Sequence, residues 1–394
     1  MFSPAAAALD LVARLQWGRL LHTPLDPGVW ALLQPAGLQN HAPQLCWLAD
    51  GQLACVWMAG GQEGTAGMHI VWSRLRPGAR CWTQPRPLSG DPQRSEQNPL
   101  LFRLADGRLQ LIHTAQLVRD PDAASVPEGS TFSMQWTARL RCRRQRSGRM
   151  AWAASRDFLA EPLFCRHPPQ PGPDGGWLLP VYRSLEAGGA FGHDHSLVLP
   201  LDAEGRPSDA LIPVPESTGR VHGSIVPSAD GRQLLQFFRS RLADWIYRSV
   251  GSLDGRSWTP PEPIALPNNN SSIQALRLAS GRLAMIFNRF QFEPDPEGLP
   301  AWGEARWPRT RWPLAIALSD DDGLSWPWIR DIDHGLGFCG EANWFCNGAL
   351  AYPTLVEGLP GDLHIAYSWA GRAAIRYLCL REEQVLGPGE EVGL

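Results

Sequence analysis

The chain has 394 residues, of which 44% are hydrophobic and 19% charged, and its formal net charge is −3. All 36 basic residues are arginines, because the sequence contains no lysine. This excludes Schiff-base chemistry and the lysine-containing phosphate loop. The small net charge gives no indication of a nucleic acid or an anionic membrane as partner. The high counts of Pro (36), Gly (39) and Trp (18) indicate many short strands joined by turns.

The first predicted element is a short helix within residues 1–25, covering 5–21, outside the main fold. Asp10, Arg14 and Arg19 interrupt this segment, so it lacks the basic start and apolar centre of a signal peptide. No apolar run in the sequence approaches the length of a membrane span. The eight cysteines show no C-x-x-C pair and no metal-ligand spacing. We therefore expect a cytoplasmic protein without a metal or another cofactor.

From residue 41 onwards one phrase recurs: a polar or proline-containing start, an apolar strand, an Asp-Gly type of turn, and a second apolar strand ending in aromatic residues. The copies begin at His41, Gln97, Arg166, Val221, Asn270 and Tyr352. Such repetition is typical of propellers, so we predict an all-β fold, a six-bladed β-propeller formed as a single domain by residues 1–394. The last copy supplies only three strands. We expect an N-terminal strand before His41 to add the fourth and close the ring.

The turn at 319–326, with the sequence SDDDGLSW, predicts a specific hairpin corner. Gly323 is expected to adopt a positive φ, and the Asp and Ser side chains to bind nearby backbone N–H groups. Trp326 is expected to fill the gap between neighbouring sheets. By topology this corner lies on the lower face of the ring, which makes its role structural.

The upper face of the ring should collect the starts of the first strands and the loops that join second to third strands. Three of these loops are long, at 115–133, 183–195 and 289–312, and long loops on one rim of a rigid scaffold often frame a binding site. The polar residues expected there are His41, Glu63, Asn98, Arg166, His167, His193, His195, His222, Arg239, Asn268, Asn270 and Tyr352. Such a polar, ring-rich pocket suits a carbohydrate, and it shows no paired carboxylates of an ordinary glycosidase.

Several strings, among them HGSIVPSADGRQLLQFFRSR, NNNSSIQALRLASGRL and IALSDDDGLSW, resemble the bacterial BNR-repeat or Asp-box family of sialidase-like propellers, often labelled predicted neuraminidases. The resemblance covers about His41 to Leu380. It implies that Tyr352 is the nucleophile, that Glu63 is the acid/base, and that Arg239 binds a sugar carboxylate. His41 stands where this family has another carboxylate-binding arginine, and His222 where it has the glutamate that assists the tyrosine. No third arginine is evident near the start of the fifth repeat.

These residues support three functions. In an exo-glycosidase acting on an acidic glycan, His222 would take the proton of Tyr352, Glu63 would protonate the leaving oxygen, and Arg239 with Arg166 would hold the substrate carboxylate. His41, Asn98, Asn268 and Asn270 would complete the sugar-binding surface. In a polysaccharide lyase acting on a uronic acid, Arg239 would neutralise the carboxylate while Tyr352 or His222 removes a proton. The third function is a propeller that binds carbohydrate without converting it.

Overall fold

The structure is a computed structural model that describes residues 16–22, 28–118, 135–146, 151–159, 161–184, 193–290, 301–302, 305–308, 310–335 and 350–387. Residues 5–15 of the predicted N-terminal helix lie outside these residues, whereas its predicted end includes the start of strand β1 (Leu21–His22). The described chain is nearly all β-structure. Its short helices are η1 (Gln135–Thr137) and α3 (Glu382–Leu386). No described helix has the length and apolar character needed to cross a membrane.

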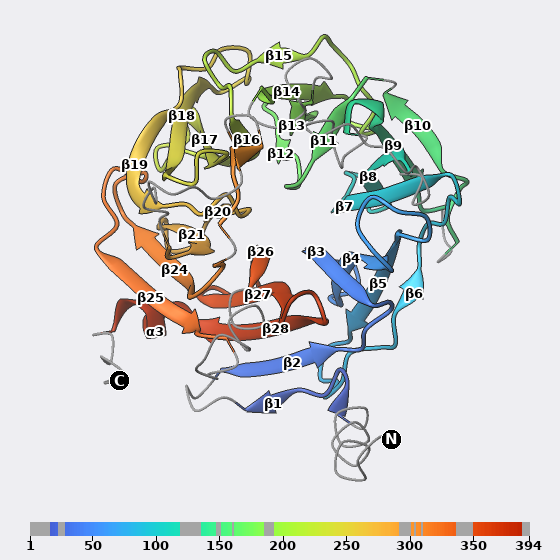
Figure 1. Cartoon of the computed structure of the whole chain (residues 1–394). Helices are drawn as coiled ribbons and strands as arrows, with labels where there is room; N and C mark the ends of the chain where they lie inside the picture. The colour runs from blue at the N-terminus through green and yellow to red at the C-terminus, as the bar shows by residue number, and fades with distance from the viewer. Residues whose placement is uncertain are drawn as a thin grey trace.

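Six antiparallel sheets stand around a central axis as the blades of a propeller (Figure 1). Blade 1 contains β3 (Gln39–Trp47), β4 (Leu53–Gly60), β5 (His69–Leu75) and β6 (Arg86–Pro87). Blade 2 contains β7 (Arg94–Arg103), β8 (Leu109–Leu117), β9 (Arg139–Arg144) and β10 (Arg156–Leu159). Blade 3 contains β11 (Leu163–Cys165), β12 (Gln170–Pro171), β13 (Trp177–Arg183), β14 (His195–Leu201) and β15 (Ile212–Pro213).

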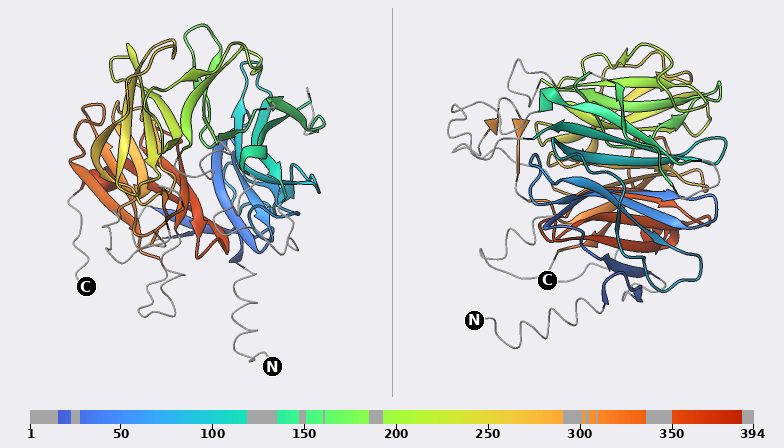
Figure 2. Two further views of the ribbon diagram at one scale, coloured as in Figure 1. Left: turned by 45° about the horizontal axis from the view of Figure 1, so that its top comes forward. Right: turned by 90° about the vertical axis from the view of Figure 1, so that its right-hand side faces the viewer.

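Blade 4 contains β16 (Arg220–Pro227), β17 (Gln233–Ser240), β18 (Trp245–Ser252) and β19 (Glu262–Pro267). Blade 5 contains β20 (Gln274–Arg277), β21 (Leu283–Asn288), β24 (Leu314–Ser319) and β25 (Trp328–Asp333). Blade 6 contains β26 (Ala351–Glu357), β27 (Asp362–Trp369), β28 (Ala374–Arg381), β2 (Val29–Leu33) and β1 (Leu21–His22). A small hairpin, β22 (Ala301–Trp302) with β23 (Ala305–Arg306), belongs to the connection from β21 to β24 and projects from one face of the disc (Figure 2).

The ring is closed by the N-terminal part of the chain, as predicted. Strand β2 pairs antiparallel with β28, from Val29 opposite Cys379 to Leu33 opposite Ile375. The last blade therefore combines the two ends of the described chain, and this closure covers a sheet edge that would otherwise be open to pairing with another molecule. Apolar side chains fill the space between neighbouring blades. One such core joins Phe237 of blade 4 to Phe287 of blade 5.

Blade 3 departs from the predicted repeat. Its inner strand was expected to begin at Arg166, but it is split into β11, which begins at Leu163, and β12, which ends at Pro171. Both pieces pair with β13. The sequence between them contains Pro168 and Pro169. Proline has no N–H to donate to a ladder, so the strand is interrupted there.

The first strands share a local distortion close to the upper face. One residue there has a positive φ in five of the blades: Ala42 (53°), Asn98 (48°), His222 (55°), Asn270 (56°) and Tyr352 (54°). The pairing of β3, β7, β16 and β26 with the next strand shifts register at the same place, which marks a bulge. Proline follows at 43, 99 and 353, and because it has no N–H, no donor is stranded by the bulge. Each bulge redirects a side chain of the inner strand where the predicted site residues are gathered.

Below the bulges, side chains connect several inner strands to the inner strand of the next blade. The Gln274 amide binds both backbone groups of Leu355, with its Nε2 and Oε1 each at 3.0 Å. The Thr354 hydroxyl accepts the N–H of Leu45 at 3.3 Å. These polar bridges fix the blades relative to one another close to the axis, so that groups from different blades are held in a constant geometry.

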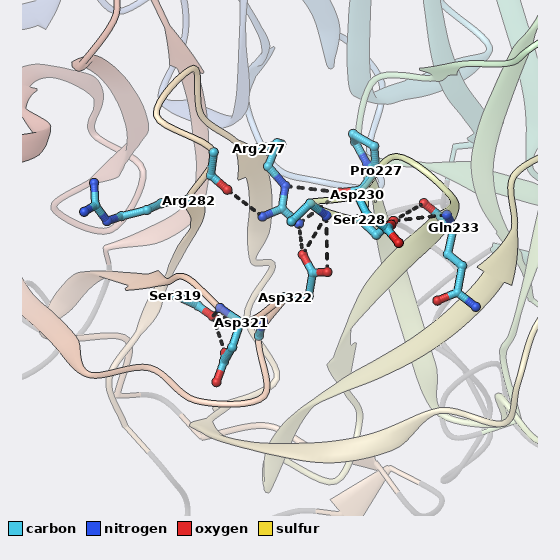
Figure 3. A network of polar contacts seen from close by, with 12 residues as sticks. Pro227, Ser228, Asp230, Gln233, Arg277, Arg282, Ser319, Asp321 and Asp322 are labelled. Carbon is cyan, nitrogen blue, oxygen red and sulfur yellow. Dashed lines mark hydrogen bonds and ion pairs between the residues drawn. The ribbon is translucent and has the colours of Figure 1, made fainter.

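The turn at 319–326 has the predicted internal bonds. The Ser319 hydroxyl accepts the N–H of Gly323 at 2.9 Å, and Gly323 has a φ of +80°. Trp326 is buried between blades 4 and 5. The turn also binds the neighbouring blade: Asp322 accepts the N–H of Ala229 of blade 4. Asp322 also forms an ion pair with Arg277 of its own blade, whose Nε donates to the carbonyl of Pro227 of blade 4 at 3.2 Å (Figure 3). The corner is therefore an inter-blade clamp as well as a turn.

Candidate active site

Tyr352 lies at the centre of a cluster of cationic and aromatic side chains on the upper face, which we call the cup. Its hydroxyl oxygen accepts a hydrogen bond from Arg239 Nη1 at 2.7 Å. The guanidinium carbons of Arg166, Arg239 and Arg311 lie 5.4, 5.5 and 5.8 Å from the centre of its ring. Burial by itself raises the pKa of Tyr352, but the charges of Arg239 and Arg311 outweigh burial and hold the pKa below its ordinary value. A phenol in this setting is more easily ionised, and therefore a better nucleophile or base, than a free tyrosine.

Arg239 reaches the cup from the end of β17, as predicted. Its side chain is fully buried, and its Nε donates to Asn270 Oδ1 at 2.7 Å. Asn270 is itself fixed by donating from Nδ2 to the carbonyl of Arg306 at 2.6 Å. The remaining nitrogen of Arg239, Nη2, is buried and has no partner among the described residues. A buried guanidinium N–H without an acceptor is unfavourable, so this atom marks a place for an anionic ligand.

A third arginine, Arg311, completes the cup, although none was evident near the start of the fifth repeat. It comes instead from the connection between the second and third strands of blade 5. Its carbonyl is held by Asn288 Nδ2 at 2.7 Å and by the N–H of Leu350 at 3.1 Å. Burial lowers the pKa of Arg311 to about 10. Within the described part of the chain its guanidinium has no acidic partner, so the cup has a second uncompensated cation.

Arg166 lies deeper and has a different set of partners. Its Nη1 and Nη2 donate to the carbonyl of Pro43 at 3.1 Å, and Nη2 also donates to the carbonyls of Tyr352 and Pro353 at 2.8 and 3.2 Å. Arg166 therefore connects blade 3 to blades 1 and 6 across the axis. Its terminal nitrogens are already occupied by backbone carbonyls, and its predicted contact with a substrate stays a prediction.

Two predicted histidines flank the Tyr352 ring. The His41 ring centre is 4.3 Å from that of Tyr352, and the His222 ring lies edge-on at 5.3 Å. His41 Nδ1 is bound to the Ser368 hydroxyl at 2.8 Å, whereas His41 Nε2 and His222 Nδ1 have no partner among the described residues. Burial and the neighbouring arginines lower the pKa of both histidines well below its ordinary value. Both imidazoles are therefore neutral at pH 7 and able to accept a proton or a hydrogen bond.

Glu63 lies at the rim, in the loop between β4 and β5. Its Oε2 forms an ion pair with Arg372 Nη1 at 2.7 Å, and its side chain is 37% exposed. Arg372 belongs to the hairpin between β27 and β28 and also donates to Gln39 Oε1 at 3.1 Å. The backbone N–H of Glu63 is held by the same Gln39 oxygen at 3.2 Å. The carboxylate is therefore fixed in position and already engaged by a cation.

The remaining predicted residues have structural partners. Asn98 is a buried bulge residue of β7. Asn268 accepts the N–H groups of Ser240 and Asn270 at 3.1 and 2.9 Å, so it shapes the turn before β20. His195 is at the start of β14. In the described part of the chain no group of three or more His, Cys, Asp or Glu side chains is placed to hold a metal ion.

The family model for the BNR repeat-like domain matches residues 51–365, which is most of the chain. The chain belongs to the BNR repeat-like domain family. Three solved structures illustrate the fold shared with this BNR repeat-like protein. A Hadza microbial sialidase has a TM-score of 0.65 at 13% identity, covering 89% of this chain and 67% of the sialidase. A protein of unknown function from Dyadobacter fermentans has a TM-score of 0.67 at 15% identity, with coverages of 89% and 97%.

The intramolecular trans-sialidase from Ruminococcus gnavus has a TM-score of 0.64 at 11% identity, covering 91% of this chain and 98% of the trans-sialidase. Comparison with curated proteins gives no match. The sequence-based prediction of a six-bladed, sialidase-like propeller with BNR repeats is therefore confirmed. At these identities the structural matches establish the fold of the BNR repeat-like protein, and its chemistry must be argued from the cup.

Sequence reasoning missed four features of the cup of this BNR repeat-like protein. Arg311 and Arg372 both come from connections between second and third strands. Because these connections were predicted to lie on the upper face, the two arginines could have been included among the candidate residues. Tyr182 of β13 also packs against His222, with ring centres 5.3 Å apart and the planes tilted by 34°. Behind it, Arg241 and Asp194 form a fully buried ion pair at 2.6 Å. This pairing depends on contacts between blades 3 and 4 that no local pattern reveals.

Proposed function

We propose that this protein is an exo-acting glycosidase for a carboxylated sugar, with Tyr352 as the nucleophile. The observation that carries the proposal is the pair of uncompensated cations over the Tyr352 ring, Arg239 and Arg311. Two guanidinium groups that flank one ring and have no ion pair with a described carboxylate favour an anionic ligand, and arginine matches a carboxylate by bidentate hydrogen bonds. The similar structures include sialidases, and this supports a sugar as the carrier of that carboxylate.

The proposed reaction assigns one task to each group. Arg239 Nη2 and Arg311 hold the sugar carboxylate, while Asn270 keeps Arg239 in place. The Tyr352 oxygen forms a bond to the anomeric carbon as the bond to the leaving oxygen breaks, and neutral His222 takes the phenol proton. Water then attacks the anomeric carbon as the bond to Tyr352 breaks; its proton goes to the group that protonated the leaving oxygen, and the phenol recovers its proton from His222. Ionisation of the phenol is favoured by Arg239 and Arg311, which is the assistance that a weak nucleophile requires.

The leaving oxygen must receive a proton, and we consider two groups as its source. Glu63, the predicted acid/base, can donate only after its ion pair with Arg372 opens, because an ionised carboxylate is an acceptor. The hydroxyl of Tyr182 has no hydrogen-bond partner among the described residues, and its side chain is 3% exposed. Burial raises the pKa of Tyr182, so it keeps its proton at neutral pH. Oppositely shifted pKa values in neighbouring groups are typical of an acid and a base that act together.

The test is turnover of acidic-sugar glycosides, measured by release of the aglycone. Tyr352→Phe and Glu63→Gln are each expected to reduce turnover by about a hundredfold. The matched substrate control has its carboxylate reduced to an alcohol and should be a poor substrate for the wild-type protein. Near-normal activity of Tyr352→Phe would refute the assignment of the nucleophile, and equal use of the acid and the alcohol would refute the role of Arg239 and Arg311.

A second candidate is a lyase acting on a uronic acid. It is favoured by one observation: within the described residues, the hydrogen-bond partner of the Tyr352 hydroxyl is Arg239, with no carboxylate to assist a nucleophilic tyrosine. In this reaction the arginines neutralise the uronate carboxylate, His222 or Tyr352 removes the neighbouring proton, and the leaving oxygen departs with a proton. The unsaturated product absorbs ultraviolet light, whereas a hydrolysis product does not. Binding of acidic sugars without either product would instead indicate a carbohydrate-binding propeller.

A further inference from the structure

A second cluster of arginines lies far from the cup, on the outer strands of blade 1. Trp72 and Arg74 lie on the same face of β5, because side chains two positions apart in a strand point to the same side. Arg76 continues this spacing just past the end of the strand. Across the ladder, Arg86 of β6 is paired with Trp72. These four side chains line a groove of about 460 Å³, together with Thr83, Gln84 and Pro85. We call this feature the arginine groove.

The three arginines of the groove have no ion pair or side-chain hydrogen bond among the described residues. Asp50 is the carboxylate that acts electrostatically on Arg74. Its hydrogen bonds, however, are with Gln52: it accepts the Gln52 Nε2 at 2.6 Å and the Gln52 backbone N–H at 3.2 Å. Burial, followed by repulsion from Arg76 and Arg86, lowers the pKa of Arg74. Three arginines thus face a single nearby carboxylate, so the cluster carries a net positive charge.

Several other arginines on the outside of the ring differ in this respect. Arg139, Arg256 and Arg289 each form an ion pair with an aspartate. The arginines of the groove thus share with Arg239 and Arg311 of the cup the lack of an ion pair with a described acidic residue. In the cup, the lack of ion pairs is the reason for proposing an anionic ligand. Because the arginines of the groove also lack ion pairs, they too favour an anionic ligand.

The groove is also preorganised. The guanidinium carbon of Arg74 lies 4.8 Å above the centre of the Trp72 ring. Trp72 is held in turn by an edge contact with Trp152 of the next blade, with ring centres 6.0 Å apart. Stacking fixes the plane of the guanidinium and leaves its edge for a ligand, which reduces the entropy lost on binding.

We propose that the arginine groove binds an acidic glycan chain through its carboxylate or sulfate groups. Arg74 and Arg76 are two positions apart along β5, about 7 Å, which suits a ligand with repeated anionic groups more than a single small ion. Thr83 and Gln84 add the polar surface that sugar hydroxyls use. Single-stranded nucleic acids require exposed aromatic faces for stacking, whereas Trp72 is 6% exposed and lies beneath Arg74.

The test is direct binding by calorimetry at low salt. The probes are polygalacturonate and heparin, which carry carboxylate and sulfate groups, neutral dextran, inorganic phosphate, and single-stranded DNA. The variant combines Arg74→Gln, Arg76→Gln and Arg86→Gln. Its matched control combines Arg206→Gln, Arg232→Gln and Arg256→Gln, which removes the same charge from exposed turns on other blades. A second variant, Arg76→Gln with Arg86→Gln, leaves the stacked Arg74 in place in case its loss disturbs the fold.

We expect the triple groove variant to bind polygalacturonate and heparin about a hundredfold more weakly than the control, and the double variant about tenfold more weakly. The dependence of affinity on salt should also become shallower, because fewer charges are neutralised. Equal affinity of the groove and control variants would overturn the proposal. Binding of phosphate or DNA as tightly as of the glycans would overturn the choice of an acidic glycan. The measurement requires no turnover, so its failure is distinguishable from failure of the proposed enzymatic function.

Discussion

The cup predicts that one tyrosine ionises well before the others. The chain has five tyrosines. The charges of Arg239 and Arg311 hold the pKa of Tyr352 below its ordinary value, because they outweigh the opposite effect of burial. Burial raises the pKa of the other four tyrosines: Tyr182, Tyr247, Tyr367 and Tyr377. An alkaline titration of the folded protein, followed by tyrosinate absorbance, should therefore show one-fifth of the total change below pH 10 and the rest above it.

Two variants test the origin of this early signal. Tyr352→Phe should abolish it. Arg239→Gln should move it upward, because it removes a charge-assisted hydrogen bond worth about 1.5–3 kcal/mol. Circular dichroism must show that the protein stays folded over the range used. The reasoning would be refuted if no tyrosine ionised early in the wild-type protein, or if the early one-fifth persisted in Tyr352→Phe.

Three further outcomes concern stability. Burial and nearby charges depress the pKa of His222 in the fold, so below about pH 6.5 the unfolded chain binds more protons than the folded one. Stability to urea should therefore decrease as the pH falls from 7.5 to 5.5, and a constant value would contradict the neutral imidazole. Gly323→Ala should cost about 2–3 kcal/mol, and Gly281→Ala only about 1. Both have a positive φ, but only at Gly323 does the added carbon come within 3.1 Å of Phe237. Equal urea midpoints would disprove the packing argument. Asp322→Asn should lower the free energy of unfolding by about 1 kcal/mol, since it weakens the clamp between blades 4 and 5. Chemical denaturation that shows no loss of stability would contradict the role of Asp322 in joining the two blades.

The fold could be predicted because the sequence patterns that specify its strands and turns are local and recur along the chain. The turn around Gly323 carries its own hydrogen-bonding groups, and the alternation of apolar residues identifies the paired strands. Ring closure by β2 followed from counting the strands of the last repeat. Blade 3 was placed less well, because prolines interrupt its inner strand and remove the pattern on which the prediction depended.

The site was only partly predictable, because its geometry depends on which loops reach the axis. Tyr352, His41 and Arg239 were found because each lies at the end of a recognisable strand. Arg311 was missed because it lies in a long connection without a repeat pattern. The occupation of Arg166 by backbone carbonyls of distant blades cannot be deduced from any segment taken alone.

The position of Arg166 has a consequence for how a polymer approaches. The blades of a propeller surround a central axis, and the Arg166 side chain crosses this axis from blade 3 to blades 1 and 6. For the sugar ligand proposed above, Arg166 would block passage along the axis, so the ligand would enter the cup with its terminal residue and leave by the same face.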